Sequence, residues 1–397
     1  MKKCVSILSA VALLCLGASP ARAAPRAAAA GGAYRVLVFS DVHQRANEGA
    51  VTTAFMNAAL KHYAGKLDLV VFTGDIMCQT ACATVESIRA AVRVVLAPVK
   101  AAAVPFVIVF GNHDYGDVPE TVKTQITKTG ILQMYIEEGA GLCVNAIETA
   151  YADANGGITN FGFPIQNDAD EDFAALYFFD EGGHKPGVGG DRAVMQDQLA
   201  VFARDQAAWG YPQTFVFQHI ALPEVYDAAL QAPKYVPGLT GGWDGNAHLL
   251  LPGLRMDGVM LEPPCPPHFS DGEYEALTAE GNVRAVFFGH DHVNDYVVRD
   301  EAADFDMVNI PGLCWEVYGT FPLRGARLIT LTQGAGGKVG YAQENYTYLR
   351  ARLTKGSGVT KTVADASDFF RGVFQYSFAW LWNAMLQPVR YFARFGK

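Results

Sequence analysis

The chain has 397 residues, of which 50% are hydrophobic and 12% aromatic, so it is long and apolar enough to bury a large core and is not a disordered chain. Its formal net charge of -9 argues against a nucleic-acid backbone as the main ligand, because that partner requires clustered Lys and Arg.

The N-terminus has the pattern of a secretory signal. A basic start at 1–3 precedes an apolar stretch over 5–16 and a small-x-small tripeptide at 21–23. A membrane anchor is the alternative, but the apolar stretch is short for a span. We expect a signal peptide over 1–23, an Ala/Gly-rich linker over 24–33, and export as a secreted, periplasmic or extracytoplasmic membrane-associated protein. Cleavage removes three positive and no negative charges and leaves a net charge of -12.

The next part of the chain alternates between strand and helix patterns. Continuous apolar runs predict strands over 34–40, 67–72 and 105–110, and longer amphipathic runs predict helices over 51–63 and 84–103. This β-α-β-α-β order favours parallel strands joined by right-handed crossovers.

Further elements are predicted downstream. A short helical piece is expected near 121–133, a helix over 192–209, and strands over 174–180, 214–217, 283–288, 306–310 and 326–332. Gly and Pro are frequent between 231 and 272, so we expect a long rim loop there, because these residues disfavour a central strand or helix.

The C-terminal stretch 372–389 contains no charged residue, is rich in Phe and Trp, and is flanked by Arg371 and Arg390. Its length would just span a bilayer, but its four Gln, Ser and Asn side chains and its aromatic content fit a membrane interface better. A helix packed on the protein's own surface is the alternative. We expect a C-terminal extension over 341–397 with possible membrane surface contact through 372–389.

Five short polar motifs follow predicted strands: DVH at 41–43, TGD at 73–75, GNHD at 111–114, QH at 218–219 and GHDH at 289–292. Open sheets carry their chemistry beyond the carboxyl ends of such strands. We therefore expect these motifs to meet at one place.

The motifs supply carboxylate, imidazole and amide donors but no thiolate, which suits Fe, Mn or Zn. Singly, each residue has an ordinary structural explanation, such as a helix cap or a turn; their joint recurrence at five strand ends favours a metal site. The set exceeds what one tetrahedral site needs, and a carboxylate bridging two ions explains the surplus. The candidates are Asp41, His43, Asp75, Asn112, His113, His219, His290 and His292.

These motifs, in this order, resemble those of the calcineurin-like metallophosphoesterases. LYFFDEGG at 176–183, FQHIALPE at 217–224, GHDHVNDY at 289–296 and RGARLITL at 324–331 resemble the branch related to single-domain purple acid phosphatases. The resemblance covers about 34 to 335 and implies a catalytic domain over 34–340. It implies an α/β fold in which two mixed sheets form a four-layer α-β-β-α sandwich.

The resemblance also implies a role for each candidate. The first metal ion would be held by Asp41, His43 and His292, and the second by Asn112, His219 and His290. Asp75 would bridge two divalent or trivalent ions, and His113 would face the substrate.

Elementary chemistry agrees with these roles. Two cations neutralise a phosphoryl group, and a hydroxide shared between them can attack phosphorus in line. An imidazole can protonate the leaving alkoxide, and His113 is the candidate because its neighbour Asn112 is tied to metal. Asp114 either orients that imidazole or only closes a turn.

One departure from the family is informative. Coloured purple acid phosphatases carry a Tyr ligand shortly after the bridging Asp, whereas this chain reads Ile76-Met77-Cys78 after Asp75. The sequence therefore predicts a colourless enzyme.

We expect a metal-dependent phosphoric ester hydrolase acting on a small-molecule phosphate ester, in the first place a phosphomonoesterase. The alternatives are a phosphodiesterase acting on a cyclic nucleotide, a nucleotide-sugar or a lipid head group, and a non-catalytic metal-binding protein with the same fold. His184, His248 and His268 lie in expected loops and are candidates for substrate contact.

Overall fold

The computed structural model describes residues 33–46, 48–147, 156–167, 170–182, 193–232, 240–241, 248–252, 255–267, 269–320, 323–334, 338–351 and 366–395. The predicted signal peptide over 1–23 and residues 24–32 of the predicted linker lie outside the described residues, as do His184 and His268.

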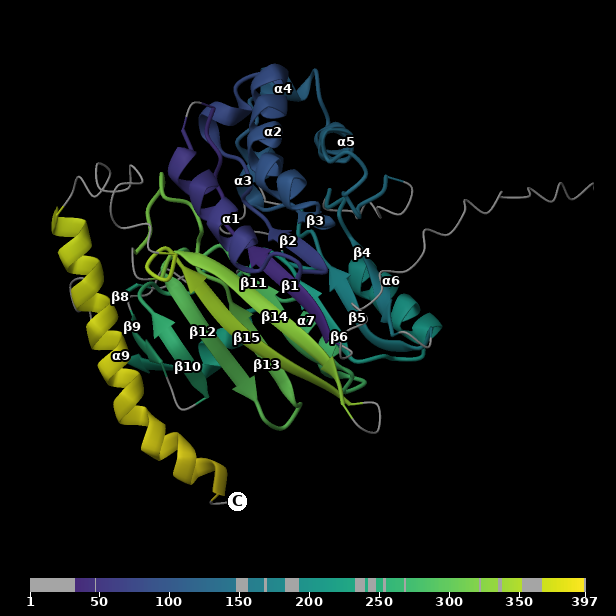
Figure 1. Cartoon of the computed structure of the whole chain (residues 1–397). Coiled ribbons are helices and arrows are strands. Elements are labelled where there is room, and N and C mark those ends of the chain that lie inside the picture. The colour runs from purple at the N-terminus through teal and green to yellow at the C-terminus, as the bar shows by residue number, and fades with distance from the viewer. Residues whose placement is uncertain are drawn as a thin grey trace, which may run out of the picture.

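The first of two central sheets contains the predicted β-α-β-α-β unit (Figure 1). Strands β1, β2 and β3 are parallel, and α1 and α2 connect them. Strands β14 and β15 complete the sheet in antiparallel pairing. The sheet order is β15 (Val339–Thr347), β14 (Gly325–Gln333), β1 (Ala33–Phe39), β2 (Leu69–Thr73) and β3 (Phe106–Val109), and the helices are α1 (Ala50–His62) and α2 (Val85–Ala102).

The second sheet is also mixed. Its centre, from β5 through β6 and β11 to β13, is parallel, and β4, β12 and β10 pair antiparallel at its two sides. The order is β10 (Met256–Met260), β12 (Asn294–Asp300), β13 (Phe305–Asn309), β11 (Val283–Phe288), β6 (Thr214–Phe217), β5 (Asp172–Phe178) and β4 (Phe161–Gln166).

Three hydrophobic clusters define the layers. One lies between the sheets and includes Val36, Val71, Phe217 and Phe287, all fully buried. A second joins the first sheet to α1, α2 and α5 (Lys128–Glu138), and a third joins the second sheet to α6 (Gln196–Trp209) and α7 (Glu273–Thr278). Strands buried on both faces therefore read as unbroken apolar runs, and the expected α-β-β-α sandwich is confirmed.

Two local predictions need correction. The single helical piece expected near 121–133 is two helices, α4 (Glu120–Lys123) and α5, because the Thr127 side chain accepts from the Gly130 N–H and begins a new helix. A shorter α3 (Asn112–Gly116) precedes them.

The rim loop expected over 231–272 contains strands. Strands β7 (Ala229–Ala232), β8 (Thr240–Gly241) and β9 (His248–Pro252) form a small separate sheet, and β10 is an edge strand of the second sheet. Gly and Pro exclude central strands but are compatible with edges, and Gly258 in β10 has φ +124° and approaches the Asp295 carbonyl too closely for a Cβ.

The predicted C-terminal helix is longer than expected and lies against the protein. Helix α9 (Ala366–Phe395) runs along β10 (Figure 1), where Asn383 donates to the Gly258 carbonyl and Gln387 donates to Asp257 Oδ1 at 3.1 Å. No helix in the described part of the chain is both long and apolar enough to cross a membrane. The first sheet continues to Thr347 in β15, past the predicted domain boundary at 340.

Candidate metal centre

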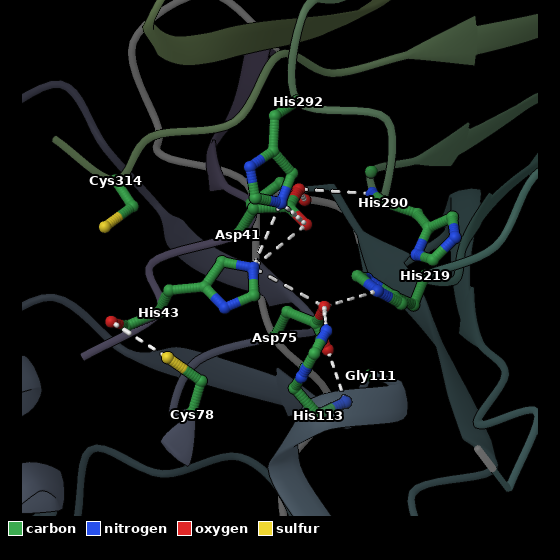
Figure 2. A network of polar contacts seen from close by, with 12 residues as sticks. Asp41, His43, Asp75, Cys78, Gly111, His113, His219, His290, His292 and Cys314 are labelled. Carbon is green, nitrogen blue, oxygen red and sulfur yellow. Dashed lines mark hydrogen bonds and ion pairs between the residues drawn. The ribbon is translucent and has the colours of Figure 1, made fainter. Parts of the chain in front are cut away.

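The five polar motifs follow β1, β2, β3, β6 and β11 and meet at the carboxyl ends of these strands (Figure 2). Most of their side chains point toward one another although they come from loops far apart in the sequence. The five motifs therefore meet at one place, as the sequence predicted.

The first group consists of Asp41, His43 and His292, whose candidate ligand atoms all lie within 4.8 Å of one another. The Nε2 atoms of His43 and His292 are 3.0 Å apart, and His292 Nε2 lies 3.3 Å from Asp41 Oδ1. All three residues are buried. These are the residues predicted to hold the first ion.

The second group consists of Asp75, His219 and His290, again within 4.8 Å. Asn112 belongs beside it, because its Oδ1 lies 3.0 Å from His219 Nε2. Asp75 Oδ2 is 3.2 Å from His219 Nε2 and 3.6 Å from His43 Nε2, so one oxygen faces both groups.

The donor atoms of the centre are arranged to bind cations rather than to form hydrogen bonds with one another. Asp41 Oδ2 accepts from the Ser40 hydroxyl at 2.6 Å and from the His290 N–H at 3.1 Å, whereas the buried Asp41 Oδ1 has no hydrogen-bond partner. A buried carboxylate oxygen left in this way is costly. It faces the nitrogens of His43 and His292, which is the arrangement that a bound cation would satisfy.

Backbone carbonyls fix the orientation of two of the imidazoles. His219 Nδ1 lies 2.8 Å from the Thr73 carbonyl, and His292 Nδ1 lies 3.0 Å from the Tyr318 carbonyl. A carbonyl only accepts, so each Nδ1 carries the proton and each Nε2 faces the centre. This is the tautomer that a metal ligand of this kind requires.

Charges within the centre keep its carboxylates ionised. Burial alone would raise the pKa of Asp41, but the charge of His292 lowers it to about 2. Burial opposes ionisation of Asp75 too, yet His219 holds the pKa of Asp75 well below its usual value. Burial lowers the pKa of His43 to about 4, which leaves this imidazole neutral and able to offer a lone pair.

The backbone is strained where the candidate ligands lie. Of the ten described non-glycine residues with positive φ, four belong to the centre: Asp41 (52°), His43 (44°), Asp75 (50°) and His290 (71°). Each such residue costs on the order of 1–3 kcal/mol, and such strain clusters at functional sites. Packing between the two sheets must therefore hold these loops in place.

Two motif glycines give the side chains room. A Cβ on Gly74 would collide with the His219 ring, and a Cβ on Gly111 would collide with Asp75. The TGD and GNHD motifs therefore require glycine for close approach as well as their polar residues for chemistry.

His113 lies beside both groups. Its backbone N–H donates to Asp75 Oδ1 at 2.8 Å, and its Nε2 is 4.0 Å from Asp75 Oδ2. Its Nδ1 lies 3.0 Å from Asp117 Oδ2. This hydrogen bond to Asp117, assisted by the charge of Asp75 and opposed by burial, raises the pKa of His113 to about 9.

The suggestion that Asp114 orients His113 was wrong, and the alternative of a turn-closing role holds. Asp114 accepts the backbone N–H groups of Gly111, Ile76 and Met77 at 2.8–2.9 Å, and so ties together the loops after β2 and β3. Asp117 contacts the imidazole instead, and its spacing of four residues from His113 was the available signal.

Glu181 is a second residue that sequence reasoning missed. Its Oε1 accepts the N–H groups of His219 at 3.2 Å and Ile220 at 2.9 Å, so it positions the loop that carries a candidate ligand. Burial raises the pKa of Glu181 to about 8. Its place in LYFFDEGG, just beyond β5, was the only signal.

A pocket of about 780 Å³ opens over the centre and is large enough for a small molecule. Candidate ligands, including His43 and His292, form its floor together with His113. Arg45, Glu262 and Tyr318 also line it. The Tyr318 ring stacks on the His292 ring with centroids 4.2 Å apart. His248, a candidate for substrate contact, begins β9.

Comparison with known proteins agrees with this geometry. The profile of the family described as "Calcineurin-like phosphoesterase" matches residues 34–294. A relative from Arabidopsis thaliana, "Probable inactive purple acid phosphatase 29", is 28% identical over 333 residues, covering 73% of this chain and 75% of the relative. "Phosphatase DCR2" of Saccharomyces cerevisiae is 26% identical over 322 residues, covering 72% of this chain and 48% of the yeast protein. The chain thus spans about half the length of that phosphatase.

Among solved structures, a dimetal phosphatase from Danio rerio superposes with a TM-score of 0.51 at 13% identity. The match covers 79% of this chain and 99% of the other. At this identity the likeness concerns the fold.

The substitution Asp75→Asn should deplete both metal ions, because one carboxylate oxygen faces the two groups. Metal content per chain, measured by elemental analysis after gel filtration, checks this. Asp304→Asn is the matched control, since Asp304 is an exposed aspartate with nearly the same positive φ. Full occupancy of both sites in Asp75→Asn would contradict the shared role.

Proposed function

This chain belongs to the calcineurin-like phosphoesterase family, and on that premise we propose that it is a metal-dependent phosphomonoesterase acting on a small-molecule phosphate ester. The observation that carries the proposal is the joint position of the two donor groups, which share Asp75, and of His113 in one pocket. Asp41, His43 and His292 would hold one ion, and Asn112, His219 and His290 the other. When bound, the two ions would polarise the phosphoryl group and activate the attacking water.

The chain's own residues account for the remaining steps. Asp75 fixes the place of His113 through its backbone N–H, so the imidazole projects beside the centre and into the pocket. A protonated His113 can donate from Nε2 to the leaving oxygen, which avoids release of a strongly basic alkoxide. Positive charge on this ring also favours a phosphate monoester dianion over a less charged diester.

The non-catalytic alternative deserves comparison, because the Arabidopsis relative carries "inactive" in its name. In this chain, all eight candidate residues are present, and the His113 ring is hydrogen-bonded to Asp117, which is not a candidate ligand. A protein that only stores metal has no need of an oriented proton donor. This favours a catalytic role.

A phosphate-release screen on metal-quantified protein tests the proposal. We expect turnover of p-nitrophenyl phosphate to exceed turnover of bis-p-nitrophenyl phosphate. The reverse order would favour the phosphodiesterase alternative, and no turnover of either compound with both ions bound would favour the non-catalytic one.

Replacing His113 by Ala should lower turnover of phenyl phosphate, whose leaving group is strongly basic, by about 10²–10⁴-fold, the range usual for loss of a general acid, while both ions stay bound. Steady-state kinetics and metal analysis on the same sample measure the two effects. His62→Ala, on helix α1, is the matched control. Loss of metal from His113→Ala would show that His113 is a ligand and not the proton donor.

We also propose that the chain is exported and rests on a lipid surface through α9. Of the eleven exposed large hydrophobic side chains in the described chain, seven are on α9. Phe374, Phe378, Leu381 and Met385 recur at helical spacing, on the face opposite the buried Ala379 and Asn383. Such a stripe suits the interface of a bilayer.

Sedimentation with anionic phospholipid vesicles tests this surface. The intact chain should pellet with the vesicles, and the double substitution Phe378→Ser and Leu381→Ser should remain in the supernatant. Tyr211→Ser, at an exposed aromatic residue elsewhere, is the control. Equal pelleting of the double variant, or no pelleting of the intact chain, would refute contact through α9.

A further inference from the structure

From the geometry around α3 we infer that Asp117 is a positioning residue for the reaction: it holds the His113 ring in the one orientation that presents the Nε2 proton of the imidazolium to the leaving group. This inference rests on the proposed phosphomonoesterase function. It assigns to Asp117 a role that none of the sequence motifs indicates.

The contact itself is direct. Asp117 follows the last residue of α3 and lies one helical turn after His113, and its Oδ2 is 3.0 Å from His113 Nδ1. A carboxylate accepts but does not donate, so the Nδ1 proton lies in this hydrogen bond. Nε2 is then the nitrogen that is 4.0 Å from Asp75 and available to the pocket.

Asp117 is itself held in place. The same Oδ2 accepts the Gln79 N–H at 2.8 Å, and the Gln79 side chain accepts from Arg45 at 2.8 Å. Gln79 has φ +46°, so the loop after β2 adopts an uncommon backbone conformation to reach this position. That loop also carries Asp75. The position of the Asp117 carboxylate is therefore fixed relative to the metal centre.

His113 is therefore fixed from two sides. Its backbone N–H is bonded to Asp75, and its ring is bonded to Asp117, while the His43 and His113 rings pack edge to face with centroids 5.1 Å apart. Asp114 is bonded elsewhere, since its two oxygens accept backbone N–H groups of the loops after β2 and β3. Asp117 is the one carboxylate bonded to this ring within the described chain.

The proton balance of the step is simple. The oxygen of a water molecule forms a bond to phosphorus as the bond between phosphorus and the leaving oxygen breaks, and the electron pair of the broken bond stays on the leaving oxygen. The leaving oxygen takes the proton from His113 Nε2, and the imidazolium becomes a neutral imidazole that keeps its Nδ1 proton in the bond to Asp117. Water restores the Nε2 proton after the product leaves.

Substrates with different leaving groups separate positioning from mere structural support. p-Nitrophenolate is weakly basic and leaves with little help, whereas phenolate needs protonation. In Asp117→Asn, turnover of phenyl phosphate should fall on the order of 10–100-fold, with a much smaller fall for p-nitrophenyl phosphate and an unchanged KM for both. Glu120→Gln, which removes an exposed carboxylate paired only with Lys123, should leave both substrates unaffected.

A double-mutant cycle completes the test. If Asp117 acts through His113, adding Asp117→Asn to His113→Ala should cause no further loss. Nitrogen chemical shifts of the neutral His113 ring, recorded without metal at high pH, should show a protonated Nδ1 in the parent chain and an altered tautomer balance in Asp117→Asn.

Equal losses on the two substrates, or an undiminished loss in the His113→Ala background, would overturn the inference and leave Asp117 as a support for the Gln79 loop. A parent chain that hydrolyses neither substrate would instead count against the proposed function, so the two failures are distinguishable.

Discussion

The Asp75 carboxylate joins the loops that form the centre. One oxygen accepts the His113 N–H at 2.8 Å, and the other faces His219 at 3.2 Å and His43 at 3.6 Å. The Asp75 backbone carbonyl also accepts the His43 N–H at 2.8 Å. Loops that follow β1, β3 and β6 are therefore all arranged around one residue that follows β2, and the position of the proton donor depends on the same group as the positions of the ligands.

The rest of the fold serves to hold this arrangement. The loops carry positive φ at Asp41, His43 and Asp75, a conformation that an isolated loop would leave. The strands directly before them, β1 and β2, belong to the first sheet, which packs face to face on the second, and their register cannot slip without moving apolar side chains out of the core. The stability of the sandwich therefore keeps the loops after its strands in the strained conformation that the centre requires.

The candidate ligands could be predicted from the sequence, because the carboxyl ends of parallel strands meet and the motifs occur directly after apolar runs. The partner of His113 was harder to predict. Asp114 is adjacent in sequence, but neighbours on a helix point in different directions, whereas residues four apart share a face, as His113 and Asp117 do. The contact of Glu181 with the His219 N–H exists because β5 pairs with β6, Phe178 opposite Phe217. This pairing is known only once the fold is known. The strands within 231–272 were missed because Gly and Pro exclude a central strand but not an edge strand.

The most direct test of the central claim is anomalous X-ray diffraction from crystals of the metal-loaded protein. Two peaks roughly 3.5–4 Å apart are expected, one at Asp41, His43 and His292 and the other at Asn112, His219 and His290, with the Asp75 carboxylate between them. A single peak, or two peaks of which only one is near Asp75, would contradict a centre built on a shared carboxylate.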